Sequence, residues 1–488
     1  MKTLCLTIIA FLLGIQLFSQ PVSPSDDFRI KTHEALQEFK KHNKLPGVAF
    51  ALFDNTNIII TDCLGKSSDG SDITDLSLFS IQSISKNITA LAVMIAVEEG
   101  LVSLDSSVTR YLPGFKVNSC FEESPEKKIT LRLLLSHQAG FTHEAPVGSN
   151  YDFVPCENQD HLNSIKETWL KFPVGTNYSY SNLGMDLASE VVASVSGVSF
   201  NDYLKTKIFG PASMPSTTTD DREVVLNKNL TAGTIQGLKR KHYAIPLPGS
   251  GAVFTDLDDF VRYAQMLMNY GKAGDHMVID KKFLLQMFTI QKHNYGLGTY
   301  LDKGDDISYI NHNGGGFGYS ATLLWFPEYN IGSVMLSSRP CTTFDFCFSA
   351  LKDYVNEKHI QKNEAATAML DSLNGEYFAS KKLIDKSQFY SCKCDSAYKP
   401  EWDRYVGKYA AELKGMDFRW HIKVARFFGF VFPKIKVFRE GSLLKASGLT
   451  GYTVLREYEP GLFFTDNNEA LDLRNDKPTF RNISLVKR

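Results

Sequence analysis

Apolar and polar positions follow three different patterns along this chain of 488 residues. Residues 28–43 repeat apolar side chains at helical spacing, which predicts an opening helix. Residues 44–65 hold two apolar runs separated by the polar residues 54–57, an arrangement typical of a hairpin of two strands. Residues 84–97 are almost entirely apolar, so we expect a helix that is buried on several sides.

Helical patterns continue after this segment and strands then return. Further helices are predicted at residues 131–136, 185–196 and 257–270. From residue 309 the pattern is again that of strands, with a turn at residues 327–330. Strands at both ends of a region with helices between them predict an α+β domain, in which an antiparallel sheet flanked by helices joins the two ends.

The C-terminal part has a different character. Residues 358–400 are polar and mixed, which predicts a helix followed by a linker. From residue 401 to residue 488 short apolar runs alternate with turn residues, which favours a separate small all-β domain, a sandwich or a barrel. The first domain is therefore expected to span residues 28–357.

The N-terminal residues 1–20 resemble a secretory signal peptide, with the basic Lys2, an apolar core and a small or polar end. The alternative is a membrane anchor, but the apolar run is interrupted and short for a span. We therefore expect export, to a periplasmic or extracellular location, with no transmembrane span left after cleavage.

Composition narrows the class of protein. The chain is 43% hydrophobic and 22% charged, which is typical of a globular protein with a sizeable core. Its formal net charge of -1 gives no electrostatic basis for binding nucleic acid or an anionic membrane.

Eight cysteines raise the question of disulfides and metal binding. Export permits disulfides, and we expect either Cys341–Cys347 or Cys120–Cys156 as a bridge. The cysteines and histidines lack the C-x-x-C and H-E-x-x-H spacings of metal sites, so we predict neither a metal nor a cofactor.

Lys86 is the unexpected residue in the apolar segment, because it lies in the first turn of a helix that should be buried. Burial costs an ammonium several kcal/mol or lowers its pKa until it is neutral. Ser83 lies three residues earlier and therefore on the same helical face. A neutral lysine can accept the proton of a serine hydroxyl, which makes that serine a nucleophile, whereas the alternative is a lysine that reaches solvent.

Several stretches together resemble the serine β-lactamase and penicillin-binding-protein superfamily, and most closely its class C-like branch of β-lactamase-related serine hydrolases. These stretches are KLPGVAFAL, FSIQSISKNITA with Ser83 and Lys86, ITLRLLLSHQAGF, the Y-x-N element Tyr180–Ser181–Asn182, and HNGGGFGYS. The resemblance extends over residues 45–354. It implies the β-lactamase/transpeptidase-like fold and an acyl-enzyme on Ser83.

The resemblance also implies a role for each matched residue. Ser83, Lys86 and Tyr180 would be catalytic, and the N–H groups of Ser83 and Gly315 would form the oxyanion hole. The phenol of Tyr180 suits proton transfer, although a buried aromatic with a satisfied hydroxyl is the alternative. Asn182 suits a substrate amide or a contact with Lys86, and would otherwise be a turn residue.

The third element departs from the K-T-G of penicillin-recognising members, because His312 stands in place of the lysine, followed by Asn313 and Gly314. His312 and Gly314 are expected to bind substrate. A histidine is mostly neutral at neutral pH, so recognition of a substrate carboxylate should be weaker. His137 is assigned to packing of a turn, since its spacing matches no catalytic-histidine pattern.

The expected function is that of an exported serine hydrolase that cleaves an amide or ester bond, as an esterase, a D-aminopeptidase or a D-Ala-D-Ala carboxypeptidase does. Its partner would be a small-molecule or peptide substrate, such as one derived from the cell wall. Two alternatives stay open, a β-lactamase and a non-catalytic protein that binds cell wall or regulates.

Overall fold

The computed structural model describes residues 24–67, 69–148, 156–235, 238–239, 247–304, 306–380, 394–411, 434–448 and 451–487. The predicted signal peptide, residues 1–20, lies outside the described residues. Among the described residues no single helix has the length and apolar content of a membrane span, although α6 (Asn182–Ser196) and residues 200–209 pass together as a pair bent by 80°.

A six-stranded antiparallel sheet forms the centre of the first domain, in the order β2-β1-β12-β11-β10-β9. Strand β1 from the start of the domain pairs with β12 from its end, with Val48 opposite Ser337. The predicted sheet that joins the two ends is therefore confirmed. Its strands are β1 (Gly47–Asp54), β2 (Ile58–Gly65), β9 (Tyr300–Gly304), β10 (Ile307–Gly316), β11 (Tyr319–Phe326) and β12 (Ile331–Ser337).

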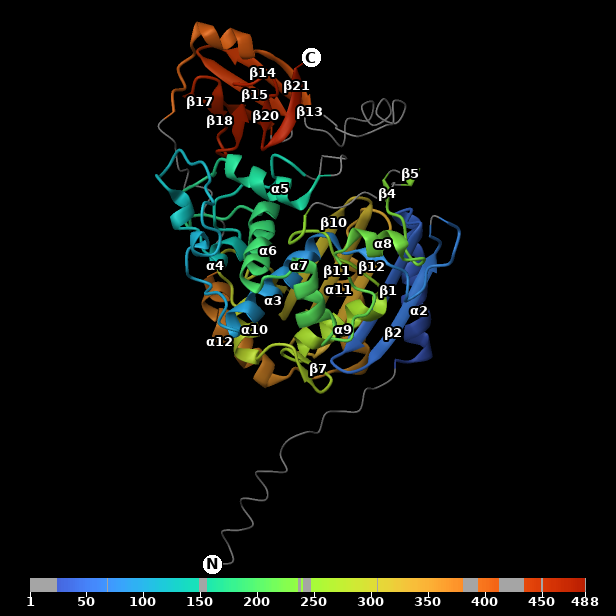
Figure 1. Cartoon of the computed structure of the whole chain (residues 1–488). Helices are drawn as coiled ribbons and strands as arrows, with labels where there is room; N and C mark the ends of the chain where they lie inside the picture. Colours follow the sequence, from blue (N-terminus) through green and yellow to red (C-terminus); the bar gives the residue numbers. More distant parts are fainter. Residues whose placement is uncertain are drawn as a thin grey trace, which may run out of the picture.

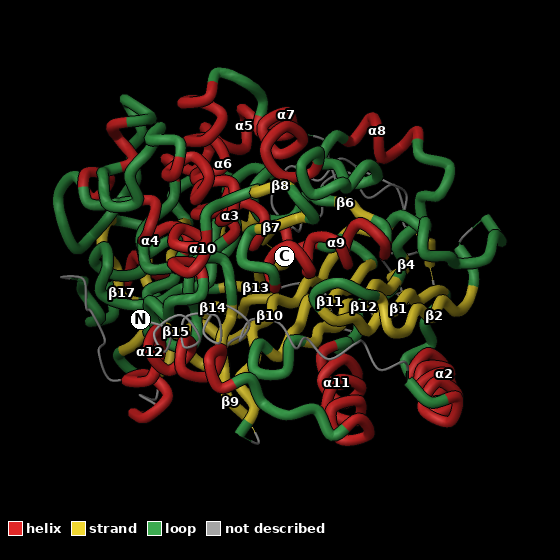
Figure 2. The backbone as a smooth tube through the Cα atoms, turned by 90° about the horizontal axis from the view of Figure 1, so that it is seen from below, coloured by secondary structure: helices red, strands yellow, loops and turns green. Residues whose placement is uncertain are grey.

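Helices cover both faces of this sheet, as Figure 2 shows. Helices α2 (Asp26–His42) and α11 (Phe344–Lys358) lie on one face and enclose a core that includes Phe50, Leu324 and Met335. The opposite face packs against α3 (Ser85–Glu98) and α9 (Leu257–Met268) through Phe53, Leu323 and Val334. Both faces of the central strands are apolar because each face is buried, which explains their continuous hydrophobic runs.

Further α-helices belong to the first domain. Among them, α6 lies next to α3 and is buried along Leu183, Leu187 and Val191. These helices are α4 (Leu131–Leu135), α5 (Asn158–Ser164), α6 (Asn182–Ser196), α7 (Phe200–Leu204), α8 (Asp221–Leu226), α10 (Lys281–Met287) and α12 (Glu364–Ser380). Short strand pairs complete the domain, namely β3 (Phe79–Ser80) with β6 (Phe254–Thr255), β4 (Thr234–Ile235) with β5 (Leu238–Lys239), and β7 (Lys272–Ala273) with β8 (His276–Met277).

The segment after α11 contributes to the first domain. Helix α12 buries Leu370 in the core around α3. Asn374 accepts a hydrogen bond from the Ile290 N–H at 2.8 Å and donates one to the Phe288 carbonyl at 2.9 Å. The helix is thus fixed to the turn after α10 by polar contacts as well as by packing.

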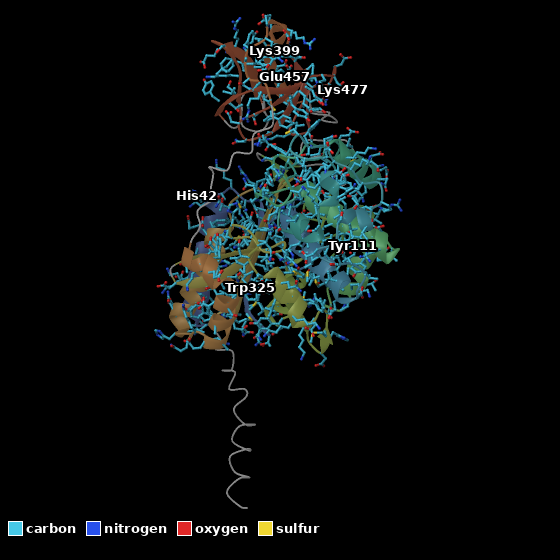
Figure 3. All side chains as sticks on the ribbon, turned by 90° about the vertical axis from the view of Figure 1, so that its left-hand side faces the viewer. His42, Tyr111, Trp325, Lys399, Glu457 and Lys477 are labelled. Atoms are coloured by element: carbon cyan, nitrogen blue, oxygen red, sulfur yellow. The ribbon has the colours of Figure 1, made fainter. Side chains whose placement is uncertain are left out.

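The C-terminal residues form a nine-stranded antiparallel sheet in the order β16-β15-β14-β13-β21-β20-β19-β18-β17, which confirms the predicted all-β region. Its core surrounds the fully buried Trp402. Figure 3 places Lys399 and Glu457 together in this region, where they form an ion pair at 2.9 Å. The strands are β13 (Gly407–Ala411), β14 (Lys434–Glu440), β15 (Leu443–Gly448), β16 (Gly451–Val454), β17 (Arg456–Glu459), β18 (Leu462–Phe464), β19 (Ala470–Asp472), β20 (Thr479–Phe480) and β21 (Ile483–Lys487).

This β region packs on the first domain near α5 (Figure 1). Trp169 contacts Phe464 with ring centroids 5.9 Å apart. Glu469 forms an ion pair with Lys171 at 2.7 Å and accepts a hydrogen bond from the Thr142 hydroxyl at 2.8 Å. The contact therefore includes residues of the segment that follows α4.

Neither expected disulfide forms. Cys341 and Cys347 are free thiols, and Cys347 is a buried residue of α11. Cys120 is disulfide-bonded, but Cys156 is not its partner. Both predicted pairings are therefore wrong.

Candidate active site

Ser83 lies at a sharp turn in front of a buried helix. It belongs to the 3-10 turn Gln82–Ile84, and α3 begins two residues later. Gln82 adopts a left-handed conformation with φ 49°, and its side-chain amide donates to the Ser80 hydroxyl at 2.6 Å. The turn leaves Ser83 half-buried, whereas almost every residue of the helix that follows is buried.

Lys86 is completely buried, as the apolar segment predicts. Its Nζ donates hydrogen bonds to the Ser83 Oγ at 3.0 Å and to the Ser250 carbonyl at 2.9 Å. Burial lowers the pKa of Lys86 from 10.5 to about 7, and the carboxylates of Asp186 and Glu144 act in the opposite direction. A substantial fraction of this amine is therefore neutral at neutral pH and able to accept the proton of Ser83.

Tyr180 completes the group around Lys86. The Lys86 Nζ lies 4.9 Å from the centre of the Tyr180 ring. Burial raises the pKa of Tyr180, and an interaction with the Ser83 hydroxyl offsets only part of that rise, so the phenol rests protonated. The three residues that the sequence singles out as catalytic therefore lie together.

His137 holds the backbone around Tyr180 in place. Its Nδ1 accepts a hydrogen bond from the Ser181 N–H at 3.2 Å, and its carbonyl accepts one from Ser179 N–H at 2.8 Å. Its ring packs on that of Tyr180 with centroids 4.4 Å apart. His137 itself has a left-handed φ of 59°. His137 therefore packs a turn, as the sequence predicts, and this turn carries Tyr180.

Strand β10 approaches the Ser83 turn closely because it contains glycines. A Cβ at Gly314 would lie 2.0 Å from the Ile81 carbonyl oxygen, so no other residue fits there without movement. A Cβ at Gly315 would meet nothing within 4 Å, and Gly315 is exposed. Gly315 thus borders open space beside the half-buried Ser83, while Gly314 allows the strand and the turn to touch.

We expect Gly314→Ala to displace the turn that carries Ser83, because the new methyl group overlaps the Ile81 carbonyl. A displacement of about 1 Å should lower the rate at which Ser83 reacts with a fluorophosphonate by about 100-fold. The unfolding midpoint should fall as well. Gly315→Ala is the control for stability and should leave the midpoint unchanged; a Gly314→Ala protein that reacts at the normal rate would contradict this account.

His312 is buried, and both its ring nitrogens are engaged. Nδ1 donates to the Asn313 carbonyl at 2.9 Å, so Nε2 accepts from the Tyr295 hydroxyl at 3.2 Å. Burial lowers the pKa of His312 to about 3, and the nearby Lys86 acts in the same direction. The imidazole is therefore neutral, which agrees with the weak carboxylate recognition expected for it.

Asn182 lies at the first residue of α6 and is buried. Its Nδ2 donates to the Glu144 Oε1 at 3.4 Å, and its N–H donates to the His143 carbonyl at 3.1 Å. Asn182 thus forms no hydrogen bond with Lys86, and its amide binds a carboxylate whose charge acts on Lys86.

Sequence reasoning missed Glu144, Asp186 and Ser250, which surround Lys86. Ser250 is 164 residues from Lys86 along the chain and contributes only a backbone carbonyl, so no side-chain pattern marks it. Glu144 and Asp186 are buried carboxylates, and Asp186 interrupts the apolar pattern of α6. That interruption was the one available signal. No group of three or more His, Cys, Asp or Glu residues suited to a metal ion occurs within the described part of the chain.

Comparisons with known proteins identify the family of the chain. The family model described as Beta-lactamase matches residues 33–351. Penicillin-binding protein 4* of Bacillus subtilis (strain 168) is 27% identical over 287 residues, which cover 54% of this chain and 61% of that protein. The chain thus spans less than two thirds of the length of this relative.

A second relative is the D-alanyl-D-alanine-carboxypeptidase/endopeptidase AmpH of Escherichia coli (strain K12). It is 23% identical over 333 residues, which cover 64% of this chain and 84% of that protein. Among solved structures, the octameric penicillin-binding protein homologue from Pyrococcus abyssi superimposes with a TM-score of 0.56 at 18% identity, over 92% of this chain and 94% of that chain. This last similarity concerns the fold.

Proposed function

Because the chain belongs to the β-lactamase family and is a serine hydrolase of that family, we propose that it cleaves an amide or ester bond through an acyl-enzyme on Ser83. The observation that carries this proposal is the 3.0 Å hydrogen bond between the Lys86 Nζ and the Ser83 Oγ. Burial that lowers the Lys86 pKa to about 7 makes the same amine a base.

In the acylation step the Ser83 hydroxyl transfers its proton to the neutral Lys86 amine, and its oxygen attacks the substrate carbonyl carbon. The carbonyl π electrons move to the oxygen and form a tetrahedral oxyanion. The N–H groups of Ser83 and Gly315 are assigned to that oxyanion, because β10 lies against the Ser83 turn. The bond to the leaving amine or alcohol then breaks, and that group takes a proton from Lys86 through Tyr180.

Deacylation uses the same residues in reverse. The neutral Lys86, with the protonated phenol of Tyr180 as relay, accepts a proton from water, and the hydroxide attacks the Ser83 ester. Collapse of the second tetrahedral intermediate releases the acid and returns the proton to the Ser83 oxygen. The half-buried position of Ser83 beside the exposed Gly315 leaves room for the water.

The neutral charge of His312 affects which class of substrate the site should prefer. The K-T-G lysine of penicillin-recognising members is replaced by an uncharged imidazole, whose pKa burial lowers to about 3. We therefore favour an esterase or a D-aminopeptidase-type amidase over a β-lactamase or a strict carboxypeptidase. The relatives named as penicillin-binding and as D-alanyl-D-alanine carboxypeptidase/endopeptidase support a peptide or cell-wall-derived substrate.

We also propose that the protein is exported. The N-terminal sequence has the layout of a signal peptide, and an enzyme that acts on cell-wall peptides meets its substrate outside the cytoplasm. Detection of the mature N-terminus near residue 20 in a periplasmic or culture fraction would test this part of the proposal.

The substrate class can be tested with the purified full chain. Intact-mass spectrometry after incubation with a fluorophosphonate should show one added group, located on Ser83 by peptide mapping. A panel of p-nitrophenyl esters, D-amino-acid p-nitroanilides and nitrocefin should then show turnover of an ester or an amide, with nitrocefin the poorest. Absence of both label and turnover would favour a non-catalytic protein, and fastest turnover of nitrocefin would favour a β-lactamase.

A further inference from the structure

A second buried polar cluster lies behind Lys86, and the proposed reaction does not use it. His161 on α5 and Asp186 on α6 are both completely buried, and the His161 Nε2 lies 3.1 Å from the Asp186 Oδ2. The His161 Nδ1 lies 2.7 Å from the Val147 carbonyl. Burial of both partners of such a pair costs desolvation free energy, so the position of the pair near Lys86 calls for an explanation.

The partners of the two ring nitrogens determine the charge of His161. A carbonyl oxygen and a carboxylate oxygen both accept hydrogen bonds, so each ring nitrogen must donate. His161 is therefore an imidazolium. Burial lowers its pKa, but the hydrogen bond and the charge of Asp186 raise it more, and the pKa lies above its ordinary value.

Asp186 connects this imidazolium to Lys86. Its Oδ1 accepts a hydrogen bond from the Gly249 N–H at 3.0 Å, and its Oδ2 accepts one from the Ser250 hydroxyl at 3.1 Å. The Ser250 carbonyl in turn accepts the hydrogen bond from Lys86 Nζ at 2.9 Å. The turn that positions the catalytic amine is thus held by the carboxylate that His161 neutralises.

We propose that His161 and Asp186 are positioning residues that hold the turn at residues 249–250 against Lys86 and set the proton affinity of its amine. The proposal rests on the proposed role of Lys86 as the base that activates Ser83. In this arrangement His161 supplies the positive charge that balances Asp186, so that Asp186 can fix the turn without keeping Lys86 protonated.

The alternative is a purely structural ion pair that joins α5 to α6. The two accounts differ in the electrostatic effect on Lys86, because Asp186 raises the pKa of Lys86 and His161 is its counter-charge. The other titratable groups that face Lys86 are Glu144 in the segment after α4, His137 after α4, Tyr180 before α6 and His312 on β10. None of these is changed in the variants below.

The test is the pH dependence of the second-order rate constant for fluorophosphonate labelling of Ser83, measured on the full chain. Removal of the counter-charge in His161→Gln should raise the Lys86 pKa and move the acidic limb up by about one pH unit, with about tenfold slower labelling below pH 7. Asp186→Asn removes the carboxylate and should move the limb down. The double variant has neither charge, so its limb should lie between those of the two single variants.

The matched control is His33→Gln, which breaks a histidine–aspartate pair of 2.8 Å between α2 and β2 and should leave the limb unmoved. Circular dichroism checks that each variant is folded. An unmoved limb, or shifts of the two single variants in the same direction, would overturn the proposal. If His161→Gln does not fold, the downward shift of Asp186→Asn decides; if Asp186→Asn does not fold either, the pair is structural and the proposal fails. Failure of the unaltered chain to label would instead overturn the proposed function.

Discussion

Ser83→Ala should abolish covalent labelling by a fluorophosphonate and lower turnover of any cleaved ester or amide by about 10,000-fold or more. The reason is that the substitution removes the attacking oxygen while leaving the rest of the site in place. Ser83 is half-buried and its hydroxyl is bonded to Lys86, so the fold should tolerate the change. Intact-mass spectrometry and initial rates on the best substrate of the panel measure both effects.

Ser194→Ala is the matched control, because Ser194 is an exposed serine on α6 whose hydroxyl contacts only the Tyr111 carbonyl at 3.2 Å among the described residues. It should label and turn over normally. Full labelling of Ser83→Ala at another residue, or undiminished turnover, would show that the nucleophile lies elsewhere.

Lys86→Met should separate activity from stability. Loss of the base should lower the rate of Ser83 labelling by about 1,000-fold and remove the inflection near pH 7 that the lysine gives to the profile of the unaltered protein. In that profile the rate rises with pH through about 7, since the neutral amine is the active form. Methionine fills nearly the same volume without a charge, so packing should be preserved.

The same substitution should stabilise the fold at neutral pH. The pKa of Lys86 is about 7 in the folded protein and 10.5 ordinarily, so the unfolded chain binds the proton more tightly and folding stability rises as the pH increases from 7 to 10.5. Below pH 7 the lysine is protonated in both states, and the fold bears the full free-energy cost of burying its charge. Lys86→Met removes a few kcal/mol of this cost. Thermal unfolding at pH 6 and pH 10 checks this, since the gain should shrink at the higher pH.

Lys116→Met is the control for both measurements, because Lys116 is exposed. It should change neither the labelling rate nor the unfolding midpoint. A Lys86→Met protein that is less stable than the unaltered chain at pH 6 would mean that the buried amine contributes to stability, contrary to the linkage argument above.

The first hairpin of the sheet and the Ser83–Lys86 pair were predictable because their signals are local, whereas Tyr180 and Gly315 were expected beside them from the family resemblance. The hairpin of β1 and β2 follows from two apolar runs and a polar turn. Lys86 stands out because an ammonium in an apolar helix contradicts its surroundings. Each of these inferences needs only a few neighbouring residues.

The residues that surround Lys86 were not predictable in the same way. Ser250 acts through a backbone carbonyl, and any residue in that position supplies one. Glu144 and Asp186 are brought to Lys86 by the packing of α6 and of the segment after α4, which no pattern in the sequence specifies. His161 pairs with Asp186 across 25 residues, and its role depends on burial that composition does not reveal. The two predicted disulfide pairings were wrong for the same reason, because the packing of the fold decides which cysteines meet.

The β region contacts the segment after α4 at Glu144, one of the carboxylates whose charge acts on Lys86. Glu469 is buried between Thr142, Lys171 and Arg481, and the Asn482 amide donates to the Glu144 carbonyl at 2.8 Å. A chain cut before residue 401 would leave Lys171 without its carboxylate partner and would remove the hydrogen bond to the backbone carbonyl of Glu144. The first domain and the β region therefore share a polar junction that fixes the backbone of a residue beside Lys86.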